Sequence, residues 1–527
     1  MERPSQNSAP RWLDAVVWLA VATVVVVAGY ACWCRTPLLW DGSYQFAETL
    51  RAGSPYAYLS RFHTRILWQP VVWLMPFTDN VRLLQAVYGL PFMLAPAVGL
   101  AVCWWFVRRQ MPTLIVWAAM GILATPLPGQ IFVINDSIFQ QHLFWPVFFG
   151  LLVQMTRRQK AVWAVLAVFQ FVHQIGLILL AVAALTTLIL PWERGRPRPL
   201  VARIRGSLPA IPAAFAVAAL LALLMAAKVW WTSIPGTAYY DSYAAREATW
   251  QFAKDRWWKS VWGYPLNGLR MIWLAGGVIC LQAWLFTLPK RESAARMCAA
   301  ITMVALVAGV LNWTTWADSP IAWGGAIEYR RWLVPMTMPV FILAAIEAWW
   351  RVSRTRKSED QREPAGSAAG VSIEVRDAPL QDDAVEDVRA PIDPMLPLRA
   401  AVILLLTCVY AIVICRQSTQ VNEMTSRLEA EIAASPTSTI VLPADHWLRG
   451  TPLDHWSLGW QSLVLQGKTP TKWVAPTDLP AEKLEALHRG RLPVDKFVEI
   501  DPNPGATGWF DLRRITSRQV DELPVVP

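Results

Sequence analysis

The sequence predicts an all-α polytopic membrane protein of about 11 transmembrane helices, followed by a small C-terminal α/β domain. The chain of 527 residues is 55% hydrophobic and only 16% charged, whereas soluble domains carry about 25% charged residues. Several apolar runs reach about 20 residues, the length at which a helix crosses a bilayer. The densest basic segments fall in loops that alternating spans place on one side of the membrane.

The hydropathy pattern places the spans in order along the chain. We expect them at about 12–33, 82–107, 112–126, 138–155, 161–172, 175–190, 209–231, 268–288, 297–316, 332–350 and 398–415. The apolar run 161–190 is long enough for one tilted helix, but both of its flanks are basic. We therefore predict two short helices there, which turn near "FVHQIG" at the outer side.

The basic loops orient these spans. The five densest are Arg108–Arg109, Arg157–Lys160, Arg194–Arg205, Lys290–Arg291 and Arg351–Lys357. The predicted crossings put all of them on the side of the N-terminus, which the positive-inside rule makes cytoplasmic. The net charge of +10 is explained by these loops and does not indicate nucleic-acid binding. We expect a multi-pass protein of the cell (inner or plasma) membrane.

Composition divides the chain into four parts. We expect a transmembrane module over 1–351, a disordered acidic cytoplasmic linker over 352–397, the last transmembrane helix over 398–415 and a small extracytoplasmic domain over 416–527. In the last part, "NEMTSRLEAEIAAS" and "HWSLGWQSLVLQG" have a helical period. The segments "STIVLP", "KFVEID" and "WFDLRRI" are typical of strands. All seven Cys lie in or beside apolar segments without CxxC spacing, so we expect no disulfide framework and no zinc site.

Two acids stand out among the residues predicted to face outward. Asp41 follows the first span and is flanked by Trp40 and Tyr44. Beside Gly42 it is equally consistent with a solvated turn acid and with a general base whose basicity is tuned by partial desolvation. Asp136 begins the fourth span, where an acid stabilises the helix dipole and could also take part in chemistry.

Basic and histidine side chains form the second group of candidates. Arg61, His63 and Arg65 alternate before an apolar stretch and suit either interfacial anchoring or a phosphate clamp. Arg330 and Arg331 are predicted at the outer mouth of the tenth span, where positive residues are under-represented. Beside them, Glu328 could orient one Arg while the other binds an anion, or the group could simply anchor the helix. His173, in the predicted turn, is most often a satisfied turn residue.

The order of these motifs resembles the GT-C superfamily of integral-membrane glycosyltransferases. The resemblance rests on Asp41 with the amphipathic "SYQFAETLRAG", on Asp136 in the next outer loop, on "FVHQIG", and on the late "EYRRWLVPMTMP". It covers roughly residues 12–350. It implies transfer of a hexose or pentose from a polyprenyl-phosphate donor to a cell-envelope glycan, lipid or protein acceptor on the extracytoplasmic face. The transfer would invert the anomeric carbon.

The resemblance also implies roles for individual residues. Asp41 would be the general base, with Asp136 as a second catalytic acid, and Arg65, Arg330 and Arg331 would bind the donor phosphate. The expected substrate-binding residues are Trp40, Tyr44, His63, His173, Glu328 and Tyr329. Many members of the superfamily carry a double acid where this chain has Asp41 and Gly42, so the resemblance leaves open whether Mg or Mn is bound.

Other functional classes predict different patterns. A membrane polysaccharide polymerase or ligase would carry one dominant late outer loop with catalytic His and Arg, whereas the candidate residues here are spread over several loops. A lipid or solute transporter would place ionisable residues near the middle of its spans. A receptor would use the C-terminal part, for example "PADHWLRGTPLDHWSLGW", to bind cell-wall glycan. We expect the glycosyltransferase.

Overall fold

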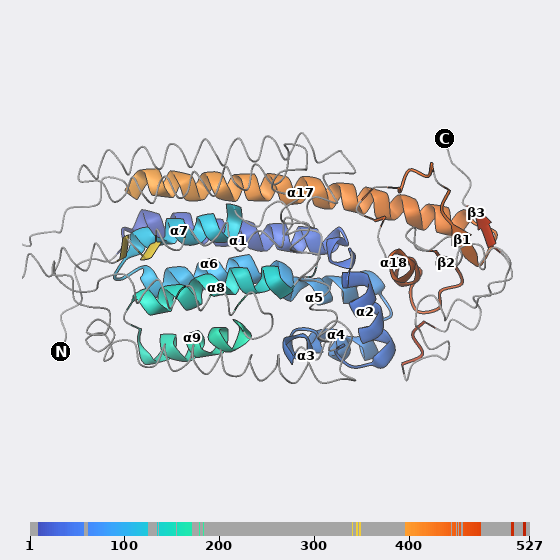
Figure 1. The fold of residues 1–527 in the computed structure, drawn as a ribbon, viewed down its shortest axis with the longest axis horizontal. Helices are drawn as coiled ribbons and strands as arrows, with labels where there is room; N and C mark the ends of the chain where they lie inside the picture. Colours follow the sequence, from blue (N-terminus) through green and yellow to red (C-terminus); the bar gives the residue numbers. More distant parts are fainter. Residues whose placement is uncertain are drawn as a thin grey trace, which may run out of the picture.

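The computed structural model describes an elongated bundle of helices with a small sheet at one end (Figure 1). It describes residues 9–39, 41–56, 62–124, 134, 136–153, 155–170, 176, 179, 183, 340, 344, 345, 347, 348, 396–443, 445–449, 451, 453, 454, 457–475, 507–510 and 520–522.

Helix α1, Arg11–Trp33, lies in the middle of the described bundle. Its 23 residues extend over about 34 Å, enough to cross the hydrocarbon core of a bilayer. One acid, Asp14, lies in its first turn, where it accepts a hydrogen bond of 2.7 Å from the indole nitrogen of Trp104. The helix packs against α5, α6 and α17, and its buried residues Val17, Val24 and Ala31 follow a helical period.

Helices α5, Val81–Met93, and α6, Ala95–Val107, together form a second apolar stretch of membrane length. The side chain of Asn80 caps α5 by accepting a hydrogen bond from the backbone nitrogen of Leu83 at 3.2 Å. Proline lacks a backbone donor and crowds the preceding turn. Pro91 inside α5 and Pro96 in the first turn of α6 therefore explain why the helix breaks at Leu94.

The next helices complete the described core. Their bounds are η4 Pro112–Leu114, α7 Ile115–Ala119, the π-helical turn η5 Met120–Ala124, α8 Asp136–Leu152 and α9 Arg157–Phe169. Thr156 and Gln159 form a capping box at the start of α9, which satisfies backbone donors that a helix otherwise leaves unpaired. Helix α8 packs against α6 and α9 and is buried over most of its length.

Helix α17, Leu396–Ala434, is a single helix of 39 residues. Its length of about 58 Å exceeds the hydrocarbon thickness of about 30 Å. The helix continues past residue 415, where the last span was predicted to end. Its final turns contain "NEMTSRLEAEIAA". Polar residues of this extension, Ser418 and Thr425, are buried together with Val421 and Leu428 on one face.

A small parallel sheet follows α17. Strand β1, Thr439–Val441, lies between β2, Trp473–Val474, and β3, Val520–Glu522. Thr439 pairs with Trp473 on one side and with Val520 on the other. Helix α18, Leu458–Leu465, connects β1 to β2, as a parallel pair requires. The predicted strand "STIVLP" and the helix in "HWSLGWQSLVLQG" are both present.

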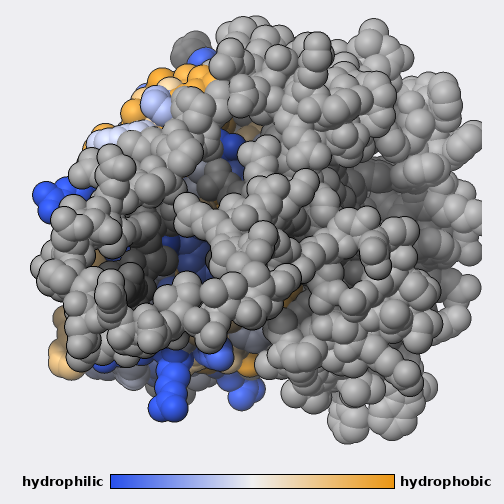
Figure 2. Space-filling view, turned by 90° about the vertical axis from the view of Figure 1, so that its left-hand side faces the viewer, coloured by the Kyte–Doolittle hydropathy of each residue, from blue (hydrophilic) through white to orange (hydrophobic). Residues whose placement is uncertain are grey.

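Exposed basic residues gather at one end of the described bundle. At the end that we call the basic end, the backbone of Ala9 bonds to that of Arg108, and Gln159 bonds to the carbonyl of Trp105. These contacts gather the exposed residues Arg11, Arg109, Arg157, Arg158 and Lys160. Figure 2 views this end, where blue hydrophilic side chains project from the rim. Two of the five predicted basic loops, Arg108–Arg109 and Arg157–Lys160, therefore lie at the same end as Arg11.

Three described helices are long and apolar enough to cross a membrane: α1, the stretch Val81–Val107, and α17. They correspond to the first, second and last spans expected from the sequence. The described part of the chain is mostly helical, as the predicted fold class requires. The predicted spans between 209 and 316 lie outside the described residues, and so does most of the acidic linker.

Candidate functional site

The candidate site lies at the end of the bundle opposite the basic end, which we call the α2 end. Helix α1 stops at Trp33, and Arg35 then adopts a left-handed backbone conformation with φ 63°. The 3-10 helix η1, Thr36–Leu38, follows, and helix α2 runs from Asp41 to Ala52. The predicted helix in "SYQFAETLRAG" is therefore present, and Asp41 is its first residue.

Glycine permits the tight approach at the start of α2. A methyl group on Gly42 would lie 1.9 Å from the carbonyl oxygen of Pro37, so no larger residue fits without movement. The same methyl group would lie 3.9 Å from Cγ1 of Ile134, which is buried two residues before α8. The beginnings of α2 and α8 are thus neighbours. The two predicted catalytic acids, Asp41 and Asp136, are the first residues of these two helices.

Arg35 ties this turn to α17. Its side chain is buried and lies 2.7 Å from a carboxylate oxygen of Glu429, which is also 3.9 Å from the guanidinium of Arg82. Next to it, the hydroxyl of Thr36 donates to Ser418 at 3.2 Å. Breaking a buried ion pair leaves a charge that water cannot reach. These contacts therefore attach the turn between α1 and α2 to the C-terminal half of α17.

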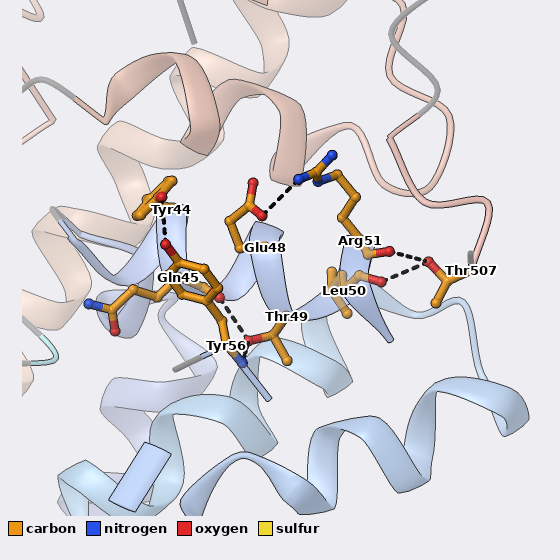
Figure 3. Close-up of polar contacts among 8 residues, drawn as sticks. All are labelled: Tyr44, Gln45, Glu48, Thr49, Leu50, Arg51, Tyr56 and Thr507. Carbon is orange, nitrogen blue, oxygen red and sulfur yellow. Dashed lines mark hydrogen bonds and ion pairs between the residues drawn. The ribbon is translucent and has the colours of Figure 1, made fainter. Parts of the chain in front are cut away.

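One face of α2 is covered by residues from the C-terminal part of the chain. Helix α18 packs on α2. The ring of Tyr44 meets that of Trp460 edge-on at 5.0 Å, and the hydroxyls of Ser43 and Ser457 are 2.9 Å apart. At the other end of α2, the hydroxyl of Thr507 donates to the carbonyls of Leu50 and Arg51 (Figure 3). Sequence segments separated by more than 400 residues thus enclose this helix.

Apolar residues of α2 also anchor the helix in the core of the bundle. Phe46, Ala47 and Leu50 are fully buried. The ring of Phe46 lies 4.9 Å from that of Tyr88, which stacks on Trp68 at 4.7 Å. Aromatic contacts of this kind add to the free energy of burial. Helix α2 is therefore held both by α18 and by the aromatic cluster of Tyr88 and Trp68.

Polar side chains of α2 interact with one another and with the segment that follows. The hydroxyls of Tyr44 and Tyr56 are 2.8 Å apart, and the hydroxyl of Thr49 donates to the carbonyl of Gln45 at 2.8 Å. Arg51 donates to a carboxylate oxygen of Glu48 at 3.1 Å. In Figure 3, Glu48 and Arg51 lie together, and the two tyrosines meet at the other end of the group.

Glu48 is a candidate that the sequence patterns did not select. It lies two turns after Asp41, so the two acids share a helix face with Tyr44. Its side chain is almost fully buried, and Arg51 compensates its charge. The seven-residue spacing between Asp41 and Glu48, which is two helical turns, is the sequence signal that could have indicated Glu48 as a site residue.

A second polar group lies inside the bundle on α8 and α9. The amide of Gln140 donates to the carbonyls of Phe169 and Gln170, and its oxygen accepts from the backbone of Gly176 at 3.0 Å. The next two residues of α8, Gln141 and His142, are also buried, and their side-chain nitrogen and oxygen atoms have no hydrogen-bond partner among the described residues. Buried polar groups without a partner are costly, so this part of α8 is a second candidate for a functional role.

The described structure locates some of the predicted site residues. Tyr44 belongs to the group on α2. Arg65 is exposed on α3, Phe62–Leu67, and the backbone of His63 belongs to the same helix. The positions of the side chains of Asp41, His63 and Asp136 lie outside the described part. So do Trp40, His173, Glu328, Tyr329, Arg330 and Arg331 in full.

The described residues contain no group of three or more His, Cys, Asp or Glu side chains placed to hold a metal ion. No protein-family model, no curated protein and no solved structure matches this chain. The chemistry of the site has to be inferred from its own residues.

Proposed function

We propose that the chain is an inverting glycosyltransferase that moves a sugar from a polyprenyl-phosphate donor to a cell-envelope acceptor at the α2 end of the bundle. The proximity of Gly42 to Ile134 carries the proposal, because it brings together the beginnings of the two helices that start at Asp41 and Asp136. The basic residues gathered at the opposite end support an extracytoplasmic α2 end under the positive-inside rule.

The proposed chemistry needs an ionised carboxylate near the acceptor. The N-terminal turn of a helix carries a partial positive charge, which stabilises a negative carboxylate there. Asp41 in the first turn of α2 then takes the proton of the acceptor hydroxyl. The acceptor oxygen forms a bond to the anomeric carbon from the face opposite the phosphate, and the bond from that carbon to the phosphate oxygen breaks. The electron pair leaves with the polyprenyl phosphate, so the anomeric configuration inverts.

Other residues would hold the two substrates. Arg330 and Arg331, which the sequence places at the same side, are proposed to bind the phosphate and to stabilise the charge of the leaving group. Tyr44 offers an aromatic face beside α18, and such faces suit the apolar faces of a sugar ring. The cover that α18 and Thr507 form over α2 would restrict water around the reacting groups.

The test is sugar transfer by the purified full-length chain in detergent, with a panel of radiolabelled polyprenyl-phosphate sugars. We expect Asp41→Asn to lower the transfer rate by about 100-fold or more, the usual contribution of a general base. Donor binding and thermal unfolding should be unchanged. Asp79→Asn is the matched control, since the side chain of Asp79 is 64% exposed and forms a surface ion pair with Lys468.

The variants separate the roles of the two acids. Asp136→Asn should also lower transfer if the beginnings of α2 and α8 form one site. Equal transfer by Asp41→Asn and by the unchanged chain would remove Asp41 from the chemistry and leave Asp136 as the base. Absence of transfer from every donor by the unchanged chain would contradict the proposal and favour the polymerase or glycan-binding alternatives.

A further inference from the structure

The segment between α2 and α5 has an unusual surface for an outer loop. It consists of α3, Phe62–Leu67, α4, Gln69–Leu74, and the 3-10 helix η3, Met75–Phe77, which follow each other almost without interruption. Figure 1 shows α3 and α4 beside α2, at the level where α1 ends. From the sequence, the basic residues at its start suited either interfacial anchoring or a phosphate clamp.

One face of this segment is fixed to the bundle. Thr64, Trp68 and Val71 are fully buried and follow the helical spacing of four and three residues. The ring of Trp68 stacks on that of Tyr88 at 4.7 Å and lies 6.0 Å from that of Phe92, both on α5. Residues of the buried face therefore account for the attachment of the segment to the protein.

The other face is apolar and exposed. Ile66, Trp73 and Phe77 are 58%, 66% and 83% exposed, and they are spaced by seven and four residues, so they lie along one stripe of the helical path. A segment that carries large apolar side chains on both faces is poorly suited to water. Trp and other aromatic residues, in contrast, are enriched where a protein meets the boundary between lipid and water.

The surroundings of the stripe indicate its occupant. Helix α4 packs against α5, and the membrane-length helices α1 and α5–α6 also expose large apolar residues, Trp33 at the end of α1 and Leu83 and Leu90 on α5. The surface becomes polar immediately after Phe77, where Asp79 is 64% exposed and pairs with Lys468 at 3.1 Å. This change from apolar to polar residues is what a membrane boundary requires.

We infer that the segment Phe62–Phe77 is embedded in the lipid leaflet at the α2 end without crossing the bilayer, and that Ile66, Trp73 and Phe77 contact lipid acyl chains. The exposed Arg65, one residue before Ile66, then lies near the lipid phosphates, where a long basic side chain can reach the headgroups. The inference is independent of the proposed glycosyl transfer.

Photocrosslinking of the full-length chain in lipid nanodiscs tests this inference. The photoreactive residue p-benzoylphenylalanine would replace Trp73 or Phe77, which preserves an aromatic side chain. Val26, 71% exposed in the middle of α1, provides the lipid-facing reference, and Asp79 provides the aqueous control. After illumination, intact-protein mass spectrometry measures the fraction of chains that carry a covalently attached lipid.

We expect the lipid adduct at positions 73 and 77 to approach that at position 26 and to exceed that at position 79 by about tenfold, because crosslinking requires direct contact and the apolar stripe faces the leaflet. Adducts at 73 and 77 no higher than at 79 would overturn the inference. Crosslinked dimers in place of lipid adducts would also overturn it, since they would identify a second copy of the chain as the occupant.

Discussion

A methyl group on Gly42 would lie 3.9 Å from Cγ1 of Ile134, although these residues belong to different predicted outer loops. This short distance shows that the first turn of α2 lies beside the residues that lead into α8. Both helices begin with an acid. Two carboxylates close to one anionic substrate repel it unless cations compensate their charge. In the proposed function, Arg330 and Arg331 supply these cations.

The first prediction concerns the approach at Gly42. We expect Gly42→Ala to reduce the free energy of unfolding by about 1–3 kcal/mol, because its methyl group would collide with the carbonyl of Pro37 at 1.9 Å. Thermal unfolding in detergent measures the effect. Gly29→Ala is the matched control, since a methyl group there meets no atom within 4 Å. Equal unfolding temperatures for the two variants would contradict the tight packing at Gly42.

The second prediction concerns an ion pair at the basic end. Arg399 lies 2.6 Å from a carboxylate oxygen of Glu347, which also accepts hydrogen bonds from Thr113 and Trp117. We expect Arg399→Met to destabilise the fold by about 3–5 kcal/mol, because a buried carboxylate would lose its cation. The double variant that also carries Glu347→Gln should recover part of this loss. A single variant as stable as the unchanged chain would show that the pair contributes little.

The third prediction concerns pH. Burial lowers the pKa of His446, whose Nε2 lies 3.1 Å from a carboxylate oxygen of Glu431. Leu448 donates its backbone N–H to Nδ1, which fixes the neutral tautomer with its proton on Nε2. The attraction of Glu431 opposes the lowering, whereas Arg427 and Arg449 reinforce it.

This lowered pKa makes the fold less stable in acid. As the pH falls below about 6.5, the unfolded chain binds a proton at His446 before the folded chain does. The stability that this residue contributes is therefore complete above that pH and is lost as the pH falls towards the folded pKa. We expect the unfolding temperature to fall more between pH 7.5 and 5.5 in the unchanged chain than in His446→Gln. Identical pH dependence would exclude this role.

The fourth prediction concerns Glu48. Its carboxylate is buried and paired with Arg51 at 3.1 Å. We expect Glu48→Gln to lower sugar transfer by less than about threefold, because Gln keeps the size and an acceptor for Arg51, whereas a general base would cost about 100-fold or more. The transfer assay with Asp41→Asn alongside measures the difference. A loss at Glu48 as large as at Asp41 would make Glu48 a catalytic acid.

The fifth prediction concerns Arg65, for which the sequence left two roles. Arg65 is exposed and precedes the exposed Ile66, so we expect it to anchor the segment at the lipid headgroups. Arg65→Lys should then change the KM for the donor by less than about threefold, since an ammonium serves equally well as a point charge. A clamp on the donor phosphate uses the planar guanidinium, so a tenfold or larger increase in KM would restore that role.

Local sequence patterns were sufficient to predict a mostly helical fold, its three described helices of membrane length and several further elements. Long apolar runs admit few alternatives to helices of membrane length, because backbone groups in lipid must be paired within the segment. The helix after Asp41 and the strand in "STIVLP" also followed from local pattern, and the structure confirms both. Hydropathy placed the end of the last span at residue 415, but it could not indicate that the helix continues to Ala434. That continuation depends on Ser418 and Thr425 being buried against other elements.

Which distant segments meet is visible only in the three-dimensional fold. Gly42 lies near Ile134, Arg35 pairs with Glu429, and α18 packs on α2, although each of these partners is far away in sequence. Local propensity and periodicity carry no information about such pairs, because the free energy that holds them comes from burial in a shared core. The exposed stripe on α3, α4 and η3 likewise follows from a tertiary contact, because the packing of Trp68 against α5 determines which residues of the segment face outward.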